Sequence, residues 1–313
     1  MVTIIILNYK GWQDTIECLA SLQKQTMQSF RVVVADNGSG DESLLRIGQW
    51  IEQEKLSGKI RLLPLKDNYG FAKGNNLAIA SVRNEDTDYF WCLNNDTVLE
   101  PECLERMVTF MDAHKDISAA TPGIRLYGKK DDLWNAGGRL VFGGRRYFCA
   151  MQPASRLDGK DVLPITFITG CALFFRKELI ATEPLFTERF FFGEEDYHFS
   201  LRMKRERRKM VCLTSAVIYH KVSASQTAVV SYNKLFIHTL NRIIDLRTAY
   251  PKPKYIFWMM LYIPYLYWHF LRSMNFGDRN RFIRLLLHEA RTNDGVSKQL
   301  FEHYLHYPFA HAQ

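Results

Sequence analysis

The chain has 313 residues, which allows one large or two small domains with a sizeable core. It is 47% hydrophobic and 24% charged, as in an ordinary globular protein, and it has no repeats or low-complexity segments that would indicate a fibrous or disordered chain. The net charge of +8 favours an anionic partner, such as a nucleotide diphosphate, a membrane surface or a nucleic acid.

The cysteines and the first residues favour a cytosolic protein. None of the six cysteines forms a CxxC pair, and several lie in apolar, strand-like runs, so we expect reduced core residues. The apolar run at residues 2–7 is too short for a signal peptide and leads directly into a fold-like pattern, so no signal peptide is expected.

Strands and helices alternate four times in the first hundred or so residues. Apolar, often β-branched runs predict buried strands at 2–7, 30–35, 60–64 and 89–93. Helices are expected after them, at about 12–25, 42–55, 74–82 and 102–114. This order predicts an α/β fold with a mostly parallel central sheet, helices on both faces and right-handed crossovers.

A polar residue follows each of these strands: Asn8, Asp36, Asn68 and Asp96. Each one alone is explained by a turn or a helix cap. Together they meet at the carboxyl edge of the sheet, which is the usual ligand crevice of such folds. Neither GxGxxG after the first strand nor GxxxxGK[ST] is present, so a dinucleotide fold or a P-loop is poorly supported.

The fourth strand stops abruptly in Asn94, Asn95 and Asp96. One carboxylate with one or two amides could hold a hard divalent cation, which prefers oxygen ligands and often shares them with substrate phosphates. For this stretch alone, a turn is the better explanation, because Asn and Asp side chains bond their own backbone.

Four motifs in order carry a resemblance to a known family. They are ILNYKG (6–11), ADNGSGD (35–41), NYGFAKGNN (68–76) and LNNDT (93–97). With this spacing the chain resembles the family 2 inverting glycosyltransferases of GT-A fold, over about residues 1 to 245. Within this family, the motif sequences most resemble those of the rhamnosyltransferase-like group that builds bacterial surface polysaccharides.

The resemblance implies a domain organisation and a nucleotide-sugar site. A GT-A domain is expected at 1–230, with a nucleotide-binding half (1–115) and an acceptor and catalytic half (116–230), followed by a helical region at 231–313. Asn8, Tyr9 and Asp36 resemble the pocket for base and ribose. The loop that resembles the lining of the nucleotide and diphosphate carries Asn68, Gly70, Phe71 and Asn75.

The resemblance also implies a divalent cation, Mg²⁺ or Mn²⁺. Asn94, Asn95 and Asp96 occupy the place of the DxD motif, whose last Asp holds the metal in the family. Asn94 replaces the first Asp, so one carboxylate is lost and lower metal affinity is expected. His220 begins a stretch, 220–225, that resembles the family's element near the diphosphate. This implies a metal ligand or diphosphate contact, although a lone His after a strand is more often structural.

The second half has a less regular pattern. It predicts a strand at 117–125, a surface loop at 127–133, a glycine-bearing hairpin or flap at 134–146, an apolar strand at 165–175 and a strand at 211–219. Arg145 and Arg146 could meet phosphate, but a solvated turn is an equally good explanation. In similar enzymes a Thr-Gly pair like Thr169-Gly170 lies near the donor sugar and acceptor. The alternative is a glycine that permits close backbone approach.

Three aromatic residues and Gly193 lead into three acids, Glu194, Glu195 and Asp196, where a helix begins. Acids at a helix start are favoured by the dipole, yet an apolar wall beside a carboxylate also raises its pKa and suits a general base. The family has an E-D pair followed by x-D-L-x-x-R, and Glu195, Asp196 and Arg202 match it, whereas the later D-L is absent. By resemblance Asp196 is the base and Glu195 orients it or contacts the acceptor. Reversed roles, or Glu194 as the base, stay open.

A helix expected at 231–250 carries Asn241 and Arg242, which again resemble the family. The aromatic, apolar stretch 255–271 follows, between basic flanks, and its seventeen residues would span roughly 25 Å as a helix, which is short for a bilayer crossing. Tyr, Trp and the flanks suit a segment in the membrane interface, beside a basic amphipathic helix at 279–291. Core-packing helices are the alternative, and the basic run 204–209 is most simply a solvated face.

The expected function is inverting transfer of a sugar from a nucleotide-diphosphate donor, dTDP-rhamnose or a UDP-sugar. The expected acceptor is a glycan on a polyprenyl diphosphate at the cytoplasmic membrane face, with no nucleic acid partner. One alternative is a nucleotidyltransferase, but its glycine- and arginine-rich signature is missing after the first strand. The other, a non-catalytic basic membrane-surface module, leaves the strand-end carboxylates unexplained. Transfer requires Asp96 and Asp196 to face each other across one cleft.

Overall fold

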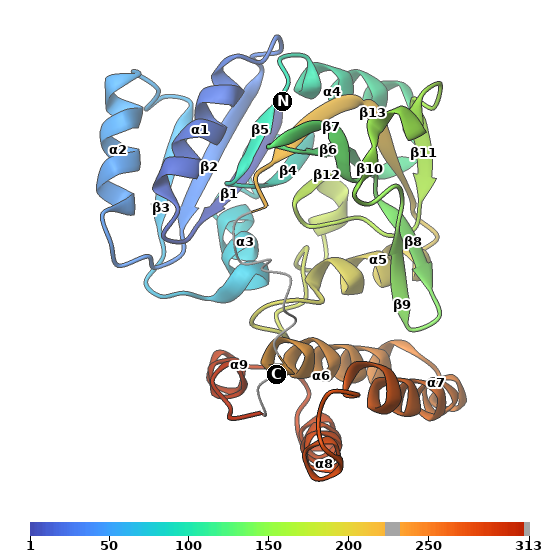
Figure 1. Ribbon diagram of the computed structural model, residues 1–313. Coiled ribbons are helices and arrows are strands. Elements are labelled where there is room, and N and C mark those ends of the chain that lie inside the picture. The colour runs from blue at the N-terminus through green and yellow to red at the C-terminus, as the bar shows by residue number, and fades with distance from the viewer. Residues whose placement is uncertain (223–231, 310–313) are drawn as a thin grey trace.

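The computed structural model describes residues 1–222 and 232–309 (Figure 1). The first elements are β1 (Val2–Asn8), α1 (Trp12–Gln23), β2 (Phe30–Asp36), α2 (Ser43–Gln53), β3 (Ile60–Pro64), α3 (Gly70–Ala80) and β4 (Tyr89–Asn94). The four predicted strands are confirmed to within one residue at each end. The helix α3 begins at Gly70 rather than at the expected Gly74, because the loop after β3 closes early into a helical turn.

These strands form the parallel half of the sheet, in the order β3-β2-β1-β4. Since β1 pairs with β2 on one side and with β4 on the other, the chain direction across the sheet reverses beside β1. Such a reversal leaves a crevice outside the carboxyl ends of the strands, which is where open α/β sheets bind ligands. Leu7 pairs with Asn94 at this point.

Beyond β4 the sheet becomes mixed, so the mostly parallel arrangement holds for the first half only. The later strands are β5 (Thr97–Leu99), β6 (Ile117–Leu126), β7 (Lys129–Asn135), β10 (Gln152–Pro153), β11 (Val162–Ile165), β12 (Ala172–Arg176) and β13 (Lys209–His220). The strand β12 runs antiparallel to both β4 and β6, and β13 runs parallel to β6 but antiparallel to β5 and β11. The short connection from β6 to β7 gives an antiparallel pair, because a parallel return needs a long crossover.

Two sequence predictions for this half are wrong. Residues 127–133 were expected to be a surface loop but belong largely to β7, whose charged outer residues 129–131 are exposed and hide the strand pattern. The stretch 165–175 is two strands, not one, because a loop at 166–171 separates β11 from β12. The predicted hairpin is confirmed as β8 (Gly138–Val141) and β9 (Gly144–Tyr147).

The core lies on both faces of the sheet. Successive residues of a strand point to opposite faces, and Trp91 of β4 packs edge-on against Phe174 of β12 on one face. Phe90 stacks on Phe175 on the other face, with ring centroids 5.7 Å apart. The remaining elements of this part are α4 (Cys103–Ala113), α5 (Glu195–Arg205) and two 3₁₀ helices (Ala154–Leu157 and Lys177–Ile180).

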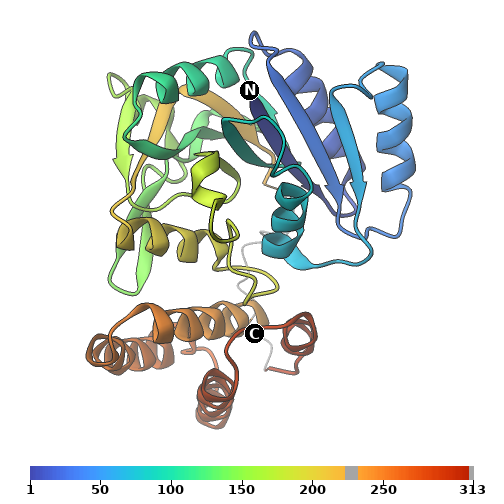
Figure 2. The same cartoon turned by 180° about the vertical axis from the view of Figure 1, so that it is seen from behind.

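A helical layer lies beneath the sheet domain in Figure 1, and Figure 2 shows it from behind. It consists of α6 (Tyr232–Ala249), α7 (Lys252–Tyr265) with a π-helix (Leu266–Phe270), α8 (Phe276–Thr292) and α9 (Lys298–Leu305). Its apolar core also includes Phe167, Phe190 and Tyr197 of the sheet domain, so the two layers are packed together. The expected boundary at 230–231 falls outside the described residues. Over residues 1–222 and 232–309, no helix has the length and apolar character needed to cross a membrane.

Asn76 connects the two halves of the sheet domain. Its Nδ2 donates to the Phe186 carbonyl at 2.8 Å, and its Oδ1 accepts from the Phe186 N–H at 3.1 Å. Asn76→Ala leaves both buried backbone groups unsatisfied, so the free energy of unfolding should fall by about 2 kcal/mol. Urea unfolding measures this. Gln49→Ala, an exposed amide on α2, is the control, and an equal loss in both variants would contradict the assignment.

Candidate active site

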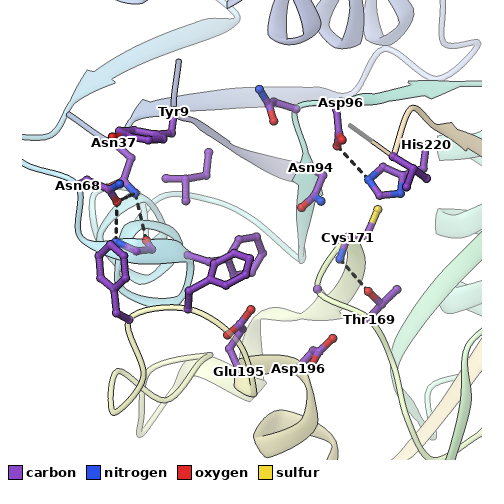
Figure 3. Close-up of a pocket in the computed structure, with 18 of the residues that line it drawn as sticks. Tyr9, Asn37, Asn68, Asn94, Asp96, Thr169, Cys171, Glu195, Asp196 and His220 are labelled. Carbon is purple, nitrogen blue, oxygen red and sulfur yellow. Dashed lines mark hydrogen bonds and ion pairs between the residues drawn. The ribbon is translucent and has the colours of Figure 1, made fainter. Parts of the chain in front are cut away.

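A cavity of about 460 Å³ opens at the carboxyl ends of β1 and β4 (Figure 3), within the size range of small-molecule sites. Its walls come from these strand ends, the amino-terminal ends of α3 and α5, and the end of β13. Eleven of the fourteen predicted site residues line it: Tyr9, Asn68, Gly70, Phe71, Asn94, Asn95, Asp96, Gly170, Glu195, Asp196 and His220. Asp96 and Asp196 therefore share one cavity, as the hypothesis requires.

The other three predicted residues lie behind the cavity wall. Asn8 and Asp36 are buried, and the Asn8 amide donates to the Asp36 carboxylate at 2.7 Å. Thr15 donates to the other end of the Asn8 amide and accepts from Asn95, which ties the ends of β1, β2 and β4 together. Asn75 donates to the Phe71 carbonyl within α3. These side chains hold the loops that line the cavity and do not line it themselves.

Asn37 is a lining residue that the sequence analysis did not single out, although it lies within the motif at 35–41. Its amide donates to Asn68 Oδ1 and to the Gly70 carbonyl, at 3.0 and 3.1 Å. Gly70 itself has φ +77°, and a Cβ there would overlap the carbonyl oxygen of Phe191. A glycine is thus required for the loop before α3 to approach the loop before α5.

Asp96 and His220 form one pole of the cavity. Their meeting follows from the antiparallel pairing of β5 with β13, in which His220 pairs with Thr97. His220 Nε2 lies 3.1 Å from Asp96 Oδ1. Burial disfavours the imidazolium, but the Cys171 and Asp96 side chains outweigh it and raise the pKa of His220 to about 10. Trp134 packs edge-on against the imidazole ring at 4.5 Å.

This pole offers a divalent cation one carboxylate and one imidazole. No group of three or more His, Cys, Asp or Glu side chains suited to a metal occurs within residues 1–222 and 232–309. A cation here would take Asp96 and His220 as protein ligands and complete its shell with substrate oxygens and water, a manner of binding common for Mg²⁺ and Mn²⁺ beside phosphates. Because only a neutral imidazole binds a metal, the cation would have to displace the proton that the raised pKa of His220 retains. The residues fit such a cation when a diphosphate is bound with it. Ser225 of the predicted element lies outside the described residues.

Glu195 and Asp196 form the opposite pole, in the first turn of α5 (Figure 3). Burial and the neighbouring Asp196 carboxylate raise the pKa of Glu195 above its usual range. Burial also raises the pKa of Asp196, against the opposing effect of the nearby Arg145 guanidinium. Within the described part of the chain, Glu195 Oε2 is buried without a hydrogen-bond partner. An orphaned oxygen on a cavity wall is suited to meet a ligand.

Arg145 reaches this pole from β9, with Nη1 3.7 Å from Asp196 Oδ1. The sequence analysis considered a phosphate contact or a solvated turn for Arg145 and Arg146; the structure gives Arg145 a carboxylate partner and leaves Arg146 exposed. Hairpin periodicity alone does not show which of two successive arginines points inward.

Glu194 lies outside the cavity and is fixed in a buried ion pair. Arg242 of α6 donates to both of its carboxylate oxygens, at 2.6 and 2.9 Å, and also to the Gly143 carbonyl at 2.8 Å. The Arg242 guanidinium lies over the Tyr197 ring, 3.8 Å from its centroid. Because both Glu194 oxygens are occupied, the structure favours Glu195 and Asp196 over Glu194 as the candidate bases.

Comparison with known sequences identifies the class of protein. Residues 3–182, more than half of the chain, match the family model described as glycosyl transferase family 2. The chain therefore belongs to glycosyl transferase family 2. An uncharacterized glycosyltransferase of Haemophilus influenzae is 24% identical over 131 residues, which are 42% of this chain and 39% of that protein. The match thus spans well under half the length of this relative.

Solved structures agree in fold. GalNAc-T7 with UDP, GalNAc and Mn²⁺ superimposes with a TM-score of 0.63 at 12% identity, covering 93% of this chain and 55% of that one. S. aureus TarS 1-349 in complex with UDP gives a TM-score of 0.58 at 16% identity, covering 97% and 89%. These likenesses establish a GT-A-like α/β fold, and so the predicted fold class is confirmed.

The Glu194–Arg242 pair can be tested by stability. Arg242→Met strands a buried carboxylate, so the free energy of unfolding should fall by roughly 3–5 kcal/mol. Glu194→Gln combined with Arg242→Met should recover part of this loss, because no charge is then left unpaired. Denaturant unfolding of the full cycle gives the coupling. Arg46→Met removes the exposed pair with Glu42 and should cost under about 1 kcal/mol. A loss in Arg242→Met no larger than in this control would contradict the role.

Proposed function

We propose that this family 2 enzyme is an inverting glycosyltransferase that uses a nucleotide-diphosphate sugar. The observation that carries the proposal is the pairing of poles in one cavity, Asp96 and His220 on one wall and Glu195 and Asp196 on the other (Figure 3). A single in-line displacement needs this arrangement, since the leaving diphosphate and the attacking hydroxyl lie on opposite faces of the sugar.

The donor is dTDP-rhamnose or a UDP-sugar, which the motif resemblance supports and which agrees with the UDP held by both structural neighbours. Tyr9 is half-exposed at the edge of the cavity, and its aromatic ring can stack on the nucleobase of the donor. The Asn68 amide lies beside Tyr9 on the same wall (Figure 3) and can donate from Nδ2 to the ribose or the phosphates, while Asn37, which donates to Asn68 Oδ1 and the Gly70 carbonyl, holds it in place.

The cation is Mg²⁺ or Mn²⁺, held by Asp96 and His220. When bound, it would neutralise negative charge that develops on the departing diphosphate. Asn94 takes the place of a carboxylate beside this pole, and its amide leaves the site with one negative charge fewer. The diphosphate itself then supplies much of the affinity for the cation.

Asp196 acts as the general base. The adjacent Arg145 charge favours its ionised form, whereas Glu195 forms no ion pair with another described residue and is the better candidate for a protonated, hydrogen-bond-donating neighbour. Asp196 removes the proton from the acceptor hydroxyl, whose oxygen attacks the anomeric carbon from the face opposite the diphosphate. The configuration inverts, and no covalent enzyme intermediate is needed.

The acceptor is a glycan carried on a polyprenyl diphosphate, and the enzyme acts at the cytoplasmic face of the membrane in surface polysaccharide synthesis. The resemblance to rhamnosyltransferase-like enzymes supports this acceptor.

Replacement of the base tests the function. Asp196→Asn should lower the rate of sugar transfer roughly 100-fold or more, because an amide cannot take the proton from the attacking hydroxyl group. Release of nucleoside diphosphate and the anomeric configuration of the product, by NMR, are the readouts. Asp131→Asn, an exposed carboxylate on β7, should keep full activity. Near-normal transfer by a folded Asp196→Asn protein would contradict the assignment of Asp196 as the general base. Release of pyrophosphate in place of nucleoside diphosphate would show that the enzyme is a nucleotidyltransferase.

The pH dependence tests the Arg145 contact. A base acts only when deprotonated, so transfer should be lost as the pH falls through the pKa of Asp196, which burial raises above its usual value of about 3.9. Arg145→Gln removes the charge that opposes this rise, so the acidic limb of kcat/KM should move to higher pH by about one unit. Arg146→Gln, its exposed neighbour, should leave the limb in place. An unshifted limb in Arg145→Gln would show that Arg145 does not act on the base.

A further inference from the structure

The helix α7 and the π-helix after it are apolar on all sides. One stripe, with Trp258, Tyr262 and Leu266, packs into the helical core. The opposite stripe is also apolar and faces outward, with Met260 61% and Trp268 70% exposed. A helix that is hydrophobic all round is normally buried on all sides, so this outward stripe requires a partner that the chain itself does not supply within residues 1–222 and 232–309.

The exposed apolar side chains gather here. Of eighteen large hydrophobic residues that are exposed in the described chain, eight lie between 256 and 276. The tip of the β8–β9 hairpin adds another, since the Phe142 ring lies 5.9 Å from that of Phe257. We call this surface the aromatic face; it comprises Phe142, Ile256, Phe257, Met260, Leu261, Tyr265, Trp268 and Phe270. Scattered exposed hydrophobic residues are normal, but a patch of this extent marks an interaction site.

The surroundings of the face are basic. Residues 251–284 contain six Lys and Arg side chains and one Asp. A second cavity, of about 520 Å³, lies between the hairpin, the end of α5 and the start of α7, and its lining includes Lys204, Arg205 and Lys254. No ion pair joins any of these three to another described residue. The basic run that the sequence analysis assigned to a solvated face thus contributes to this border.

We propose that the aromatic face docks in the interface of an anionic membrane. Tyr and Trp favour the level of the lipid headgroups, and Lys and Arg beside them attract anionic lipid. A protein partner or a second copy would satisfy the apolar stripe but would not use the excess of positive charge around it. The docking surface itself does not depend on the proposed function. Only the link between docking and a lipid-linked acceptor rests on it.

The hairpin connects this face to the catalytic pole. Phe142 lies at its tip, in the aromatic face. The N–H of the following residue, Gly143, donates to the Tyr250 hydroxyl at 3.0 Å. Further along the hairpin, Arg145 forms an ion pair with Asp196. Figure 1 shows the hairpin running from the sheet domain toward α7. Docking on this face would bring the membrane to the side of the molecule from which the hairpin leads to Asp196, as an acceptor carried on a lipid requires.

Trp268 reports on docking directly. All six tryptophans lie in the described residues, and Trp268 is the one among them whose side chain is exposed. With the full chain and vesicles of phosphatidylglycerol and phosphatidylcholine, we expect co-sedimentation and a blue shift of fluorescence, both weaker on pure phosphatidylcholine. Trp268→Phe should bind and lose the shift. Met260→Glu with Leu261→Glu should weaken binding about tenfold or more, near 1.4 kcal/mol. Leu45→Glu and Met151→Glu, exposed elsewhere, should bind normally.

The outcomes separate the possibilities. Undiminished vesicle binding by the Met260→Glu, Leu261→Glu protein would overturn the proposal. So would a concentration-dependent dimer that this variant abolishes while no vesicle binding occurs, since a second copy would then cover the face. Thermal stabilisation by UDP with Mn²⁺ is measured on every variant. Its retention shows a folded donor site, and its absence in the unaltered chain counts against a UDP donor and not against the docking face.

Discussion

The buried ion pair between Glu194 and Arg242 is the interaction on which the site depends. It joins three parts of the molecule, because Glu194 precedes α5, Arg242 belongs to α6, and the same guanidinium holds the Gly143 carbonyl of the hairpin. Glu194 has φ +70°, a left-handed conformation that a Glu adopts only when its surroundings enforce it. The turn before α5 is thereby fixed, and with it the position of the two carboxylates at the start of that helix.

The opposite pole is fixed by different means. Backbone pairing between β5 and β13 sets Asp96 beside His220, and the buried amide and hydroxyl network of Asn8, Thr15 and Asn95 holds the strand ends beneath it. Satisfied buried polar networks rigidify a fold, while an unsatisfied one is costly. The end of the cavity at Asp96 and His220 is therefore built on rigid strand ends. The end at Glu195 and Asp196 depends on a helix start that the helical layer holds in place.

This construction gives the carboxyl-terminal helices a structural part in the site, whatever covers their outer surface. The core of α6 to α9 takes in Phe190 and Tyr197, on either side of the three acids. Removal of the helical layer would expose Phe190 and Tyr197 and would take away Arg242, the ion-pair partner of Glu194. Residues 3–182, which the family model matches, end before the three acids at 194–196 and before Arg242.

The sequence alone determined the alternation of the first half, because buried strands and amphipathic helices are local patterns with their own periods. The sequence also predicted that the polar residues after these strands lie at one edge of the sheet, since the carboxyl ends of parallel strands are on the same side. Only the tertiary structure decided which polar residues face the cavity. Asn8, Asp36 and Asn37 are all buried, but only Asn37 lines the cavity. Arg145 and Arg242 acquire their roles through ion pairs with residues far along the chain, Asp196 and Glu194. Local periodicity carries no information about such partners, because the register between strands and the contacts between layers arise only when the whole core packs.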